Sequence, residues 1–326
     1  MTRWVLAAAV VILLLVPQGV GTLYSTYYMN LLTWVLIFGL FAMALDVSLG
    51  YGGLVSFGHA AFFGSGAYAA LLVLKYVVFS LPACLAAGVV AGAVVAAIVA
   101  YFAVASRGVY LAMLTFAFAQ LLYESSIKWV NFTGGSDGLP GPGRPPLVLG
   151  PVSITLADRE QLYYLVVAFV VIGYVVVRRL VASPFGAALI AVRENEARAA
   201  AIGIDVQRHK RLALVASGAL SGLAGALFAL FQNFVSPELL FWAMSGEVVI
   251  MALLGGLGTL YGGMIGAVIA VGFREILSTY TENWLVFLGA LYVLCVMFFP
   301  QGLMRLRRRR HPRDQSAGLT PAEARR

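Results

Sequence analysis

One stretch decides how this chain is organised: Ser183-Pro-Phe-Gly-Ala-Ala-Leu-Ile-Ala-Val-Arg-Glu-Asn-Glu-Ala-Arg-Ala-Ala-Ala-Ile-Gly-Ile-Asp205. These residues, called the island below, are charged and rich in helix-forming types. The chain on both sides is almost entirely apolar over lengths that suit membrane spans. The island is therefore predicted to be an ordered loop between two spans.

The rest of the composition places the chain in a membrane. Of its 326 residues, 61% are hydrophobic and only 11% are charged, whereas soluble domains carry about 25% charged residues. The net charge of +8 would suggest nucleic acid in a soluble protein. Here the basic residues lie in short segments between apolar runs, where they set orientation in the membrane. A polytopic membrane protein in a lipid bilayer is expected, with no nucleic-acid partner.

Apolar runs give the number of spans. A span needs about 20 mainly apolar residues, because about 30 Å of hydrocarbon is crossed at 1.5 Å per residue. We therefore expect an all-α fold of about ten transmembrane or half-membrane helices. The first run could instead be a signal peptide, but no clear small-x-small cleavage site follows it. The windows lie near residues 4–21, 31–49, 60–80, 81–104, 108–127, 161–180, 211–232, 246–257, 259–279 and 283–300.

Basic residues predict the orientation. They cluster in and beside the island and again after the last span, which places both segments in the cytoplasm. Alternating sides then put both termini in the cytoplasm and the loop 128–160 outside. We expect a transmembrane domain over 1–304 and a basic, disordered tail over 305–326. The clustered residues are Arg178, Arg179, Arg193, Arg198, Arg208, Lys210, Arg211, Arg305, Arg307, Arg308, Arg309, Arg310 and Arg313.

Two glycine-rich stretches interrupt the spans, at 49–58 and 254–263. Glycine lowers helix propensity by about 1 kcal/mol per residue, and irregular backbone at membrane depth survives only inside protein or beside a wet cavity. Each stretch is predicted to be a broken or re-entrant helix, and the parity of sides requires that residues 246–279 cross twice. Candidate residues of a translocation pathway lie at these breaks: Asp46, Ser56, His59, Gly255 and Gly256.

Charged residues within spans are hypotheses of function, because a charge near the middle of a bilayer costs several kcal/mol. Only Asp46 and His59 bracket a glycine break. They could line a pathway, or Asp46 could simply cap a local helix end. Pairs of small residues such as Gly88 with Gly92 and Gly218 with Gly222 are expected to let helices of this chain pack closely.

No constellation for catalysis or ligation is visible. The chain has no P-loop motif, and Gly256 to Gly262 lacks the spacing of a dinucleotide fingerprint. The histidines at 59, 209 and 311 are far apart, and Cys84 and Cys295 have no CxxC spacing. We expect no catalytic residues, no metal and no cofactor.

Capping residues predict two short helices in the island. Ser183 is a good N-cap and Pro184 suits the first helical position. Asn195 can cap a second helix that ends at Gly203, where a left-handed cap is expected. Its alanines offer a thin surface with a charged rim, as a docking element would. A solvated linker helix fits the same residues equally well.

Several stretches also resemble the permease subunits of bacterial ABC importers for branched-chain amino acids, of the LivM/LivH type, and the LivM branch in particular. They are Leu49 to Gly64, Asn131 to Gly138, the island segments 183–186, 193–196 and 199–203, and Leu254 to Gly258. The resemblance implies that the island is the cytoplasmic coupling loop that docks on an ATPase subunit. By position, the coupling residues are Glu194, Asn195, Glu196, Ala199, Ala200 and Gly203.

One departure from the family pattern concerns the docking carboxylate. That pattern puts a glutamate six residues before the glycine, at Ala197, whereas this chain has Glu196. The resemblance further implies a second homologous permease, cytoplasmic ATP-binding subunits and a periplasmic solute-binding protein. Substrates would be leucine, isoleucine or valine, or amides such as urea or aromatic acids. Alternatives are a proton-coupled secondary transporter using Asp46, Glu124 or Glu247, and a membrane scaffold or sensor.

Overall fold

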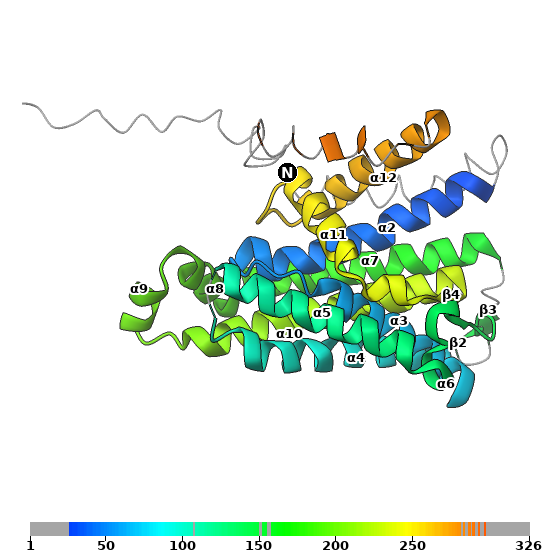
Figure 1. The fold of residues 1–326 in the computed structure, drawn as a ribbon, viewed down its shortest axis with the longest axis horizontal. Helices are drawn as coiled ribbons and strands as arrows, with labels where there is room; N and C mark the ends of the chain where they lie inside the picture. The colour runs from blue at the N-terminus through cyan, green and yellow to red at the C-terminus, as the bar shows by residue number, and fades with distance from the viewer. Residues whose placement is uncertain are drawn as a thin grey trace, which may run out of the picture.

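The computed structural model describes residues 26–106, 108–149, 152–154 and 158–281, with the single positions 283, 286, 287, 289, 290, 293 and 297. Figure 1 shows these residues as a bundle of long helices. The helices are α2 (Thr26–Asp46), the π-helix η1 (Val47–Tyr51), α3 (His59–Tyr76), α4 (Leu81–Ala103), α5 (Val109–Lys128), α6 (Val130–Thr133), η2 (Gly135–Asp137), α7 (Arg159–Ala182), α8 (Pro184–Glu194), α9 (Glu196–Ala201), α10 (Val206–Gln232), η3 (Pro237–Leu240), α11 (Trp242–Gly255) and α12 (Gly262–Tyr280).

The helices match the predicted spans that fall on described residues. Five of them are long and apolar enough to cross a membrane, namely α2 with η1, α4, α7, α10 and α12, while α11 is a shorter apolar helix. The break between α11 and α12 confirms that residues 246–279 form two helices. The first window, 4–21, lies outside the described residues, as does most of 283–300.

Helices α2 and α10 form the centre of the bundle. In each, 78% of the most apolar window is buried inside the protein, against 39% in α4 and α7 and 33% in α12. The outer helices therefore present more of their apolar surface outward, as expected where lipid is the solvent. α10 packs against α3 and α4 on one side and against α2 on another.

Glycines bring α3, α4 and α10 into backbone contact, and we call this contact the glycine seam. A Cβ added to Gly222 would lie 2.2 Å from the carbonyl oxygen of Gly88, and one added to Gly92 would lie 2.4 Å from that of Gly218. A Cβ on Gly66 of α3 would lie 2.4 Å from the carbonyl oxygen of Gly222. No side chain fits at these positions, so the predicted close packing within the chain is confirmed.

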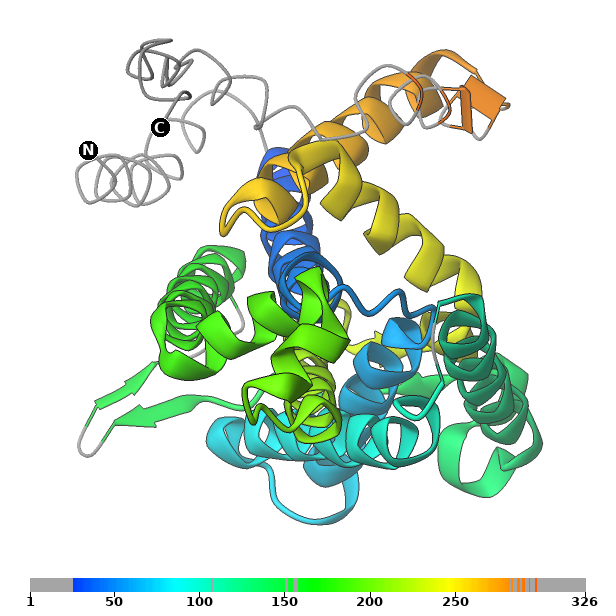
Figure 2. The same ribbon diagram turned by 90° about the vertical axis from the view of Figure 1, so that its left-hand side faces the viewer.

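The island and the loop 128–160 lie at opposite ends of the bundle (Figure 1). Figure 2 views the molecule from the island end, where α8 and α9 lie across the tips of the long helices. At the other end, β1 (Leu139–Pro140) pairs antiparallel with β4 (Phe234–Val235), and β2 (Leu147–Leu149) pairs antiparallel with β3 (Val152–Ile154). The side of the membrane that each end faces stays a prediction.

Polar contacts hold the loop 128–160 to the end of α10. Asn233 ends that helix in the left-handed conformation at φ 51°, and its Oδ1 accepts a hydrogen bond of 3.1 Å from the Gly143 N–H. Arg144 donates from Nε to the Leu230 carbonyl at 3.0 Å and from Nη2 to the Phe231 carbonyl at 2.8 Å. Its guanidinium thus donates to two of the last carbonyls of α10, and a cation is favoured at the C-terminal end of a helix.

Candidate functional site

The first glycine-rich stretch forms a π-helix at the end of α2. Backbone hydrogen bonds run from Gly53 N to Leu49 O at 3.0 Å and from Leu54 N to Ser48 O at 2.9 Å. Gly53 takes φ +67°, a conformation that suits glycine. Such wide turns are rare and often occur at functional sites. The predicted break in this span is therefore confirmed, as a π-helix followed by a loop to α3.

Asp46 joins this break to the second one. Its Oδ1 accepts a hydrogen bond of 2.8 Å from the Gly258 N–H, in the segment between α11 and α12. A Cβ added to Gly50 would lie 1.8 Å from that same oxygen and 2.5 Å from the Gly258 nitrogen. Asp46 makes no side-chain cap to its own helix, so the local-cap interpretation is wrong. Its carboxylate pairs a backbone group 212 residues away.

His59 lies on the other side of η1 in a separate polar cluster. Its Nε2 is 2.7 Å from Ser217 Oγ and 3.1 Å from Ser48 Oγ, and Ser217 Oγ donates to the Ala44 carbonyl at 2.6 Å. The cluster connects the start of α3 to α2, η1 and α10. His59 is 0% exposed and Asp46 is 3% exposed, so both are buried in this conformation.

The remaining pathway candidates shape the backbone. Ser56 is buried and its Oγ accepts from the Gly58 N–H at 3.2 Å, within the turn that precedes α3. A Cβ on Gly255 would lie 1.6 Å from the Gly262 carbonyl oxygen, and Gly256 takes φ +108°. These two glycines allow the close turn between α11 and α12. The structure brings Asp46 to this turn and keeps Ser56 and His59 with the first break.

Other charged residues of the helices have partners of their own. Glu247 of α11 pairs with Arg274 of α12 at 3.7 Å, and the exposed Glu124 accepts a hydrogen bond of 3.3 Å from Gln120 on α5. Asp46, Glu124 and Glu247 therefore lie on three different helices, and each carboxylate has a partner of its own. This placement gives the alternative of a carboxylate relay no support.

The island folds as its capping residues predict. Ser183 Oγ accepts from the Gly186 N–H at 3.4 Å at the start of α8, and Asn195 Oδ1 accepts from the Arg198 N–H at 2.9 Å at the start of α9. Gly203 takes φ +87° just after α9. The predicted pair of short capped helices is confirmed.

The proposed coupling residues divide between two faces of α9. Glu196 forms an ion pair with Lys210 of α10, and Lys210 is only 5% exposed. Ala199 is also buried. The other four sequence candidates, Glu194, Asn195, Ala200 and Gly203, are exposed. Glu196 and Ala199 thus hold α9 to the bundle, and the outward face belongs to the other residues.

Three residues at this end were not predicted as site residues. Ile202 is 72% exposed at the end of α9, although it is a large apolar side chain. Leu189 of α8 packs with Tyr51 of η1 and Ala213 of α10 in a small apolar cluster. Arg193 donates from Nη1 to the carbonyl of Gly50. An isoleucine in a charged, alanine-rich helix is a visible signal in the sequence, whereas the partners of Leu189 and Arg193 are not.

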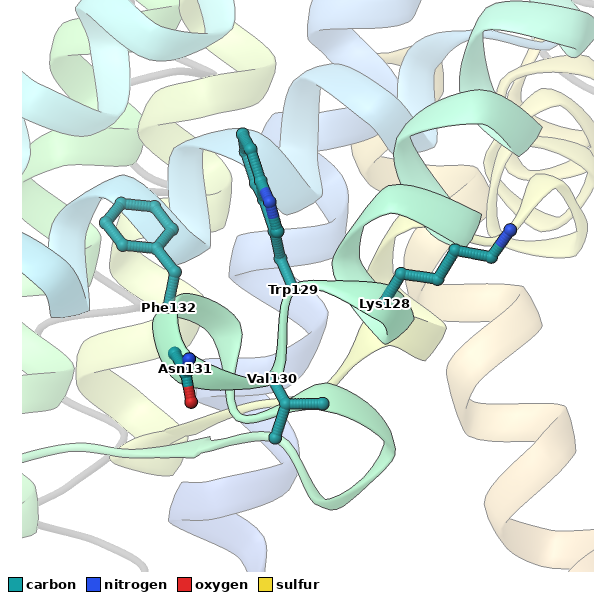
Figure 3. Close-up of a pocket in the computed structure, with 5 residues that line it drawn as sticks. All are labelled: Lys128, Trp129, Val130, Asn131 and Phe132. Atoms are coloured by element: carbon teal, nitrogen blue, oxygen red, sulfur yellow. The ribbon is translucent and has the colours of Figure 1, made fainter.

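A shallow depression of about 430 Å³ lies at the opposite end, next to α6. Figure 3 shows its lining, in which the rings of Trp129 and Phe132 point the same way and Val130 points away from them. Trp129 is 68% exposed, and Lys128 precedes it at the end of α5. Aromatic and basic side chains at the end of a span are typical of the membrane–water interface. No cluster of metal ligands occurs among the described residues.

Apolar helices packed through glycine, breaks with polar side chains, and a capped helix pair across one end define a multi-pass helical membrane protein of the permease class. The chain belongs to the family of branched-chain amino acid transport system permease components, whose sequence profile matches residues 27–296. No solved structure matches it.

Three relatives illustrate the similarity. The high-affinity branched-chain amino acid transport system permease protein LivM of Escherichia coli K12 is 30% identical over 298 residues, which cover 86% of this chain and 70% of the relative. A probable LivM of Methanocaldococcus jannaschii is 26% identical over 60% of this chain and 59% of its own length. LivH of Escherichia coli K12 is 33% identical over 37% of this chain and 40% of its own length.

Proposed function

We propose that this chain is a permease subunit of an ATP-driven importer for branched-chain amino acids or similar small amphiphilic solutes, in the bacterial inner membrane. A second homologous permease, cytoplasmic ATP-binding subunits and a periplasmic solute-binding protein complete the assembly. The permease domain is residues 1–304, with both termini in the cytoplasm and a basic tail over 305–326. Membership of the permease family and the LivM and LivH relatives support this proposal.

The outward face of α9 carries the docking proposal. Ala197, Ala200 and Ile202 are exposed there, with Glu194 and Asn195 beside them. An exposed apolar face with a polar rim is typical of a protein interface. Alanines allow a partner backbone to approach closely, and a buried isoleucine adds about 2 kcal/mol. We assign direct ATPase contacts to Glu194, Asn195, Ala200 and Gly203, together with Ile202.

We further propose that Asp46, Ser56, His59, Gly255 and Gly256 belong to the translocation pathway. In this conformation Asp46 and His59 are buried, so the pathway is closed at their level. Opening then requires the backbone to move at the two breaks. Irregular backbone is tolerated there because it faces the pathway and not the lipid. ATP binding at the partner would drive that movement through the island.

Co-purification tests the docking role. Ala200→Trp and Ile202→Asp should each reduce recovery of the partner ATPase at least tenfold, because each obstructs or charges an apolar interface worth about 2 kcal/mol or more. Ala187→Trp, an equal enlargement at an exposed position of α8, should leave recovery unchanged. Normal recovery with Ala200→Trp would contradict the assignment.

Uptake by reconstituted vesicles tests the transport function. Radiolabelled leucine, isoleucine and valine should enter only when ATP, the ATPase, the second permease and the binding protein are all supplied. Urea and benzoate, offered in parallel, define the substrate class. Uptake by the purified chain alone that is abolished by a protonophore would instead establish a secondary transporter.

A further inference from the structure

Three backbone segments meet at one point where the island joins the membrane bundle, and we call this point the glycine junction. Gly50 comes from η1, Gly258 from the break between α11 and α12, and Arg193 from the last turn of α8. A Cβ added to Gly258 would lie 3.4 Å from both Arg193 Nη1 and the Gly50 carbonyl oxygen. Both breaks in the spans therefore touch a single side chain of the island.

Arg193 is fastened at two places along its length. Its Nη1 donates a hydrogen bond to the carbonyl of Gly50. This carbonyl lies near the end of η1, and the last carbonyls of a helix have no N–H partner within the helix. A Cβ on Gly53 would lie 2.9 Å from Arg193 Cγ, so glycine at 53 leaves room for the stem. The guanidinium is planar and keeps its donors in fixed directions, which makes this contact directional.

Asp46 supplies the opposite charge on the far side of the same junction. Its carboxylate accepts from the Gly258 N–H at 2.8 Å, and it attracts the Arg193 guanidinium electrostatically. A cation from the island and an anion from α2 thus flank the two touching backbones. Asp46 is buried whereas Arg193 is exposed, so the guanidinium reaches the junction from the solvent side of the island.

The other contacts of α8 with the bundle are different in kind. Leu189 packs against Tyr51 and Ala213 through apolar surface, which is not directional. Arg193 is separated from Asn195, the cap of α9, by a single residue. A displacement of α9 therefore reaches Arg193 first among the polar contacts to the two breaks.

We propose that Arg193 is the positioning residue that transmits movement of the island to both glycine breaks, by holding the Gly50 carbonyl beside Gly258. This inference rests on the proposed docking of an ATPase at the island. It assigns Arg193 a role in coupling and none in binding the ATPase or the substrate.

Labelling of a cysteine beside the junction tests the proposal without knowledge of the substrate. Val55 is 41% exposed in the loop after η1, and Val55→Cys is made in a chain with Cys84 and Cys295 replaced by serine. The complete complex with its ATPase is labelled with a water-soluble maleimide, without nucleotide and then with ATP and vanadate. With Arg193 present, the labelling rate should change by about fivefold between the two states.

Arg193→Met keeps the stem and removes the donors and the charge. It should reduce the nucleotide-dependent change to less than about twofold, while the ATPase still co-purifies and hydrolyses ATP. Arg193→Lys keeps the charge, so its nucleotide-dependent change in labelling rate should lie between those of the unaltered complex and Arg193→Met. It replaces Arg193→Met in the test if the methionine variant does not accumulate. Arg208→Met, at an exposed arginine of α10, is the matched control and should respond normally.

A response of Arg193→Met equal to that of the unaltered complex overturns the proposal. Loss of ATPase recovery in Arg193→Met also overturns it, because the residue would then belong to the docking surface. An unaltered chain that fails to bind the ATPase at all contradicts the proposed function instead. An ATPase that binds and hydrolyses ATP without any change at Val55→Cys contradicts the inference alone.

Discussion

The glycine seam and the glycine junction both use glycine to bring backbones together, yet they differ in everything else. In the seam, Gly88, Gly92, Gly218 and Gly222 lie in regular helices, and a Cβ at each would meet backbone or an alanine methyl group. In the junction, Gly258 takes φ +71° and lies between a carboxylate and a guanidinium. The seam is a fixed apolar contact, whereas the junction is an irregular one held by polar bonds.

The comparison indicates two uses of glycine in one membrane protein. Close contact along helices gives dispersion energy over many atoms and one stable arrangement. Close contact at a break leaves few apolar contacts, so its geometry depends on a small number of directional hydrogen bonds. Substitutions in the seam should therefore affect folding, and substitutions in the junction should affect transport more than folding.

The largest effect is expected from Gly222→Leu in the seam. The new side chain would begin 2.2 Å from the Gly88 carbonyl oxygen, so α4 and α10 must separate, at a cost of about 3 kcal/mol or more. Unfolding by dodecyl sulfate titration measures the loss. Gly272→Leu in α12, where nothing lies within 4 Å, is the matched control, and equal stability of the two variants would refute the role of the seam.

Asp46→Ala should have the next largest effect on folding. It leaves the partly buried Gly258 N–H without its acceptor, which costs about 1–2 kcal/mol. Asp46→Asn keeps an oxygen that can accept the bond, so its stability should fall by less than about 1 kcal/mol. Uptake should nevertheless decline in both variants. Full transport by Asp46→Asn would show that the charge at the junction is dispensable.

Gly258→Ala separates stability from transport most directly. Its Cβ has ordinary space, and the strain at φ +71° costs about 1 kcal/mol. Uptake should fall much further than this loss of stability explains, because the methyl group would contact both Arg193 and the Gly50 carbonyl and restrict their movement relative to each other. If uptake falls only in proportion to the amount of folded protein, the junction has no special role in transport.

Ser217→Ala, the smallest change, tests the polar cluster of His59, which connects α10 of the seam to Ala44 of α2 and to Ser48 of η1. Ser217 precedes a seam glycine on α10, and its hydroxyl bonds the Ala44 carbonyl and lies 2.7 Å from His59 Nε2. Removing it should cost about 1 kcal/mol or less. A urea or dodecyl sulfate midpoint measures this. A loss as large as that of Gly222→Leu would mean that the polar cluster, rather than the seam, determines the fold.

Local chemistry explains which parts of this arrangement the sequence predicts. The caps at Ser183, Asn195 and Gly203 act within a few residues, so residue type and spacing were enough to place α8 and α9. The spans follow from the length of apolar runs, and the breaks follow from glycine. The glycine pairs of α4 and α10 likewise predict close helix packing, although they do not identify the partner helix.

The long-range polar contacts could not be predicted in the same way. Asp46 pairs with Gly258 across 212 residues, and Arg193 pairs with Gly50 across 143 residues. Which backbone groups lack helical partners depends on the π-helix, and nothing in the residue types distinguishes that helix from an α-helical turn. Glu196 looked available for docking because its partner, Lys210, lies beyond the turn that follows α9.

The position of the seam along α10 has a mechanical consequence. With 27 residues, α10 is about 40 Å long, and Gly218 and Gly222 lie near its middle. Its two ends are tied to different surfaces, through Lys210 to the island and through the carbonyls that Arg144 binds to the opposite loop. If α10 tilts about its middle, where glycine leaves no side chain, those two surfaces must move in opposite directions.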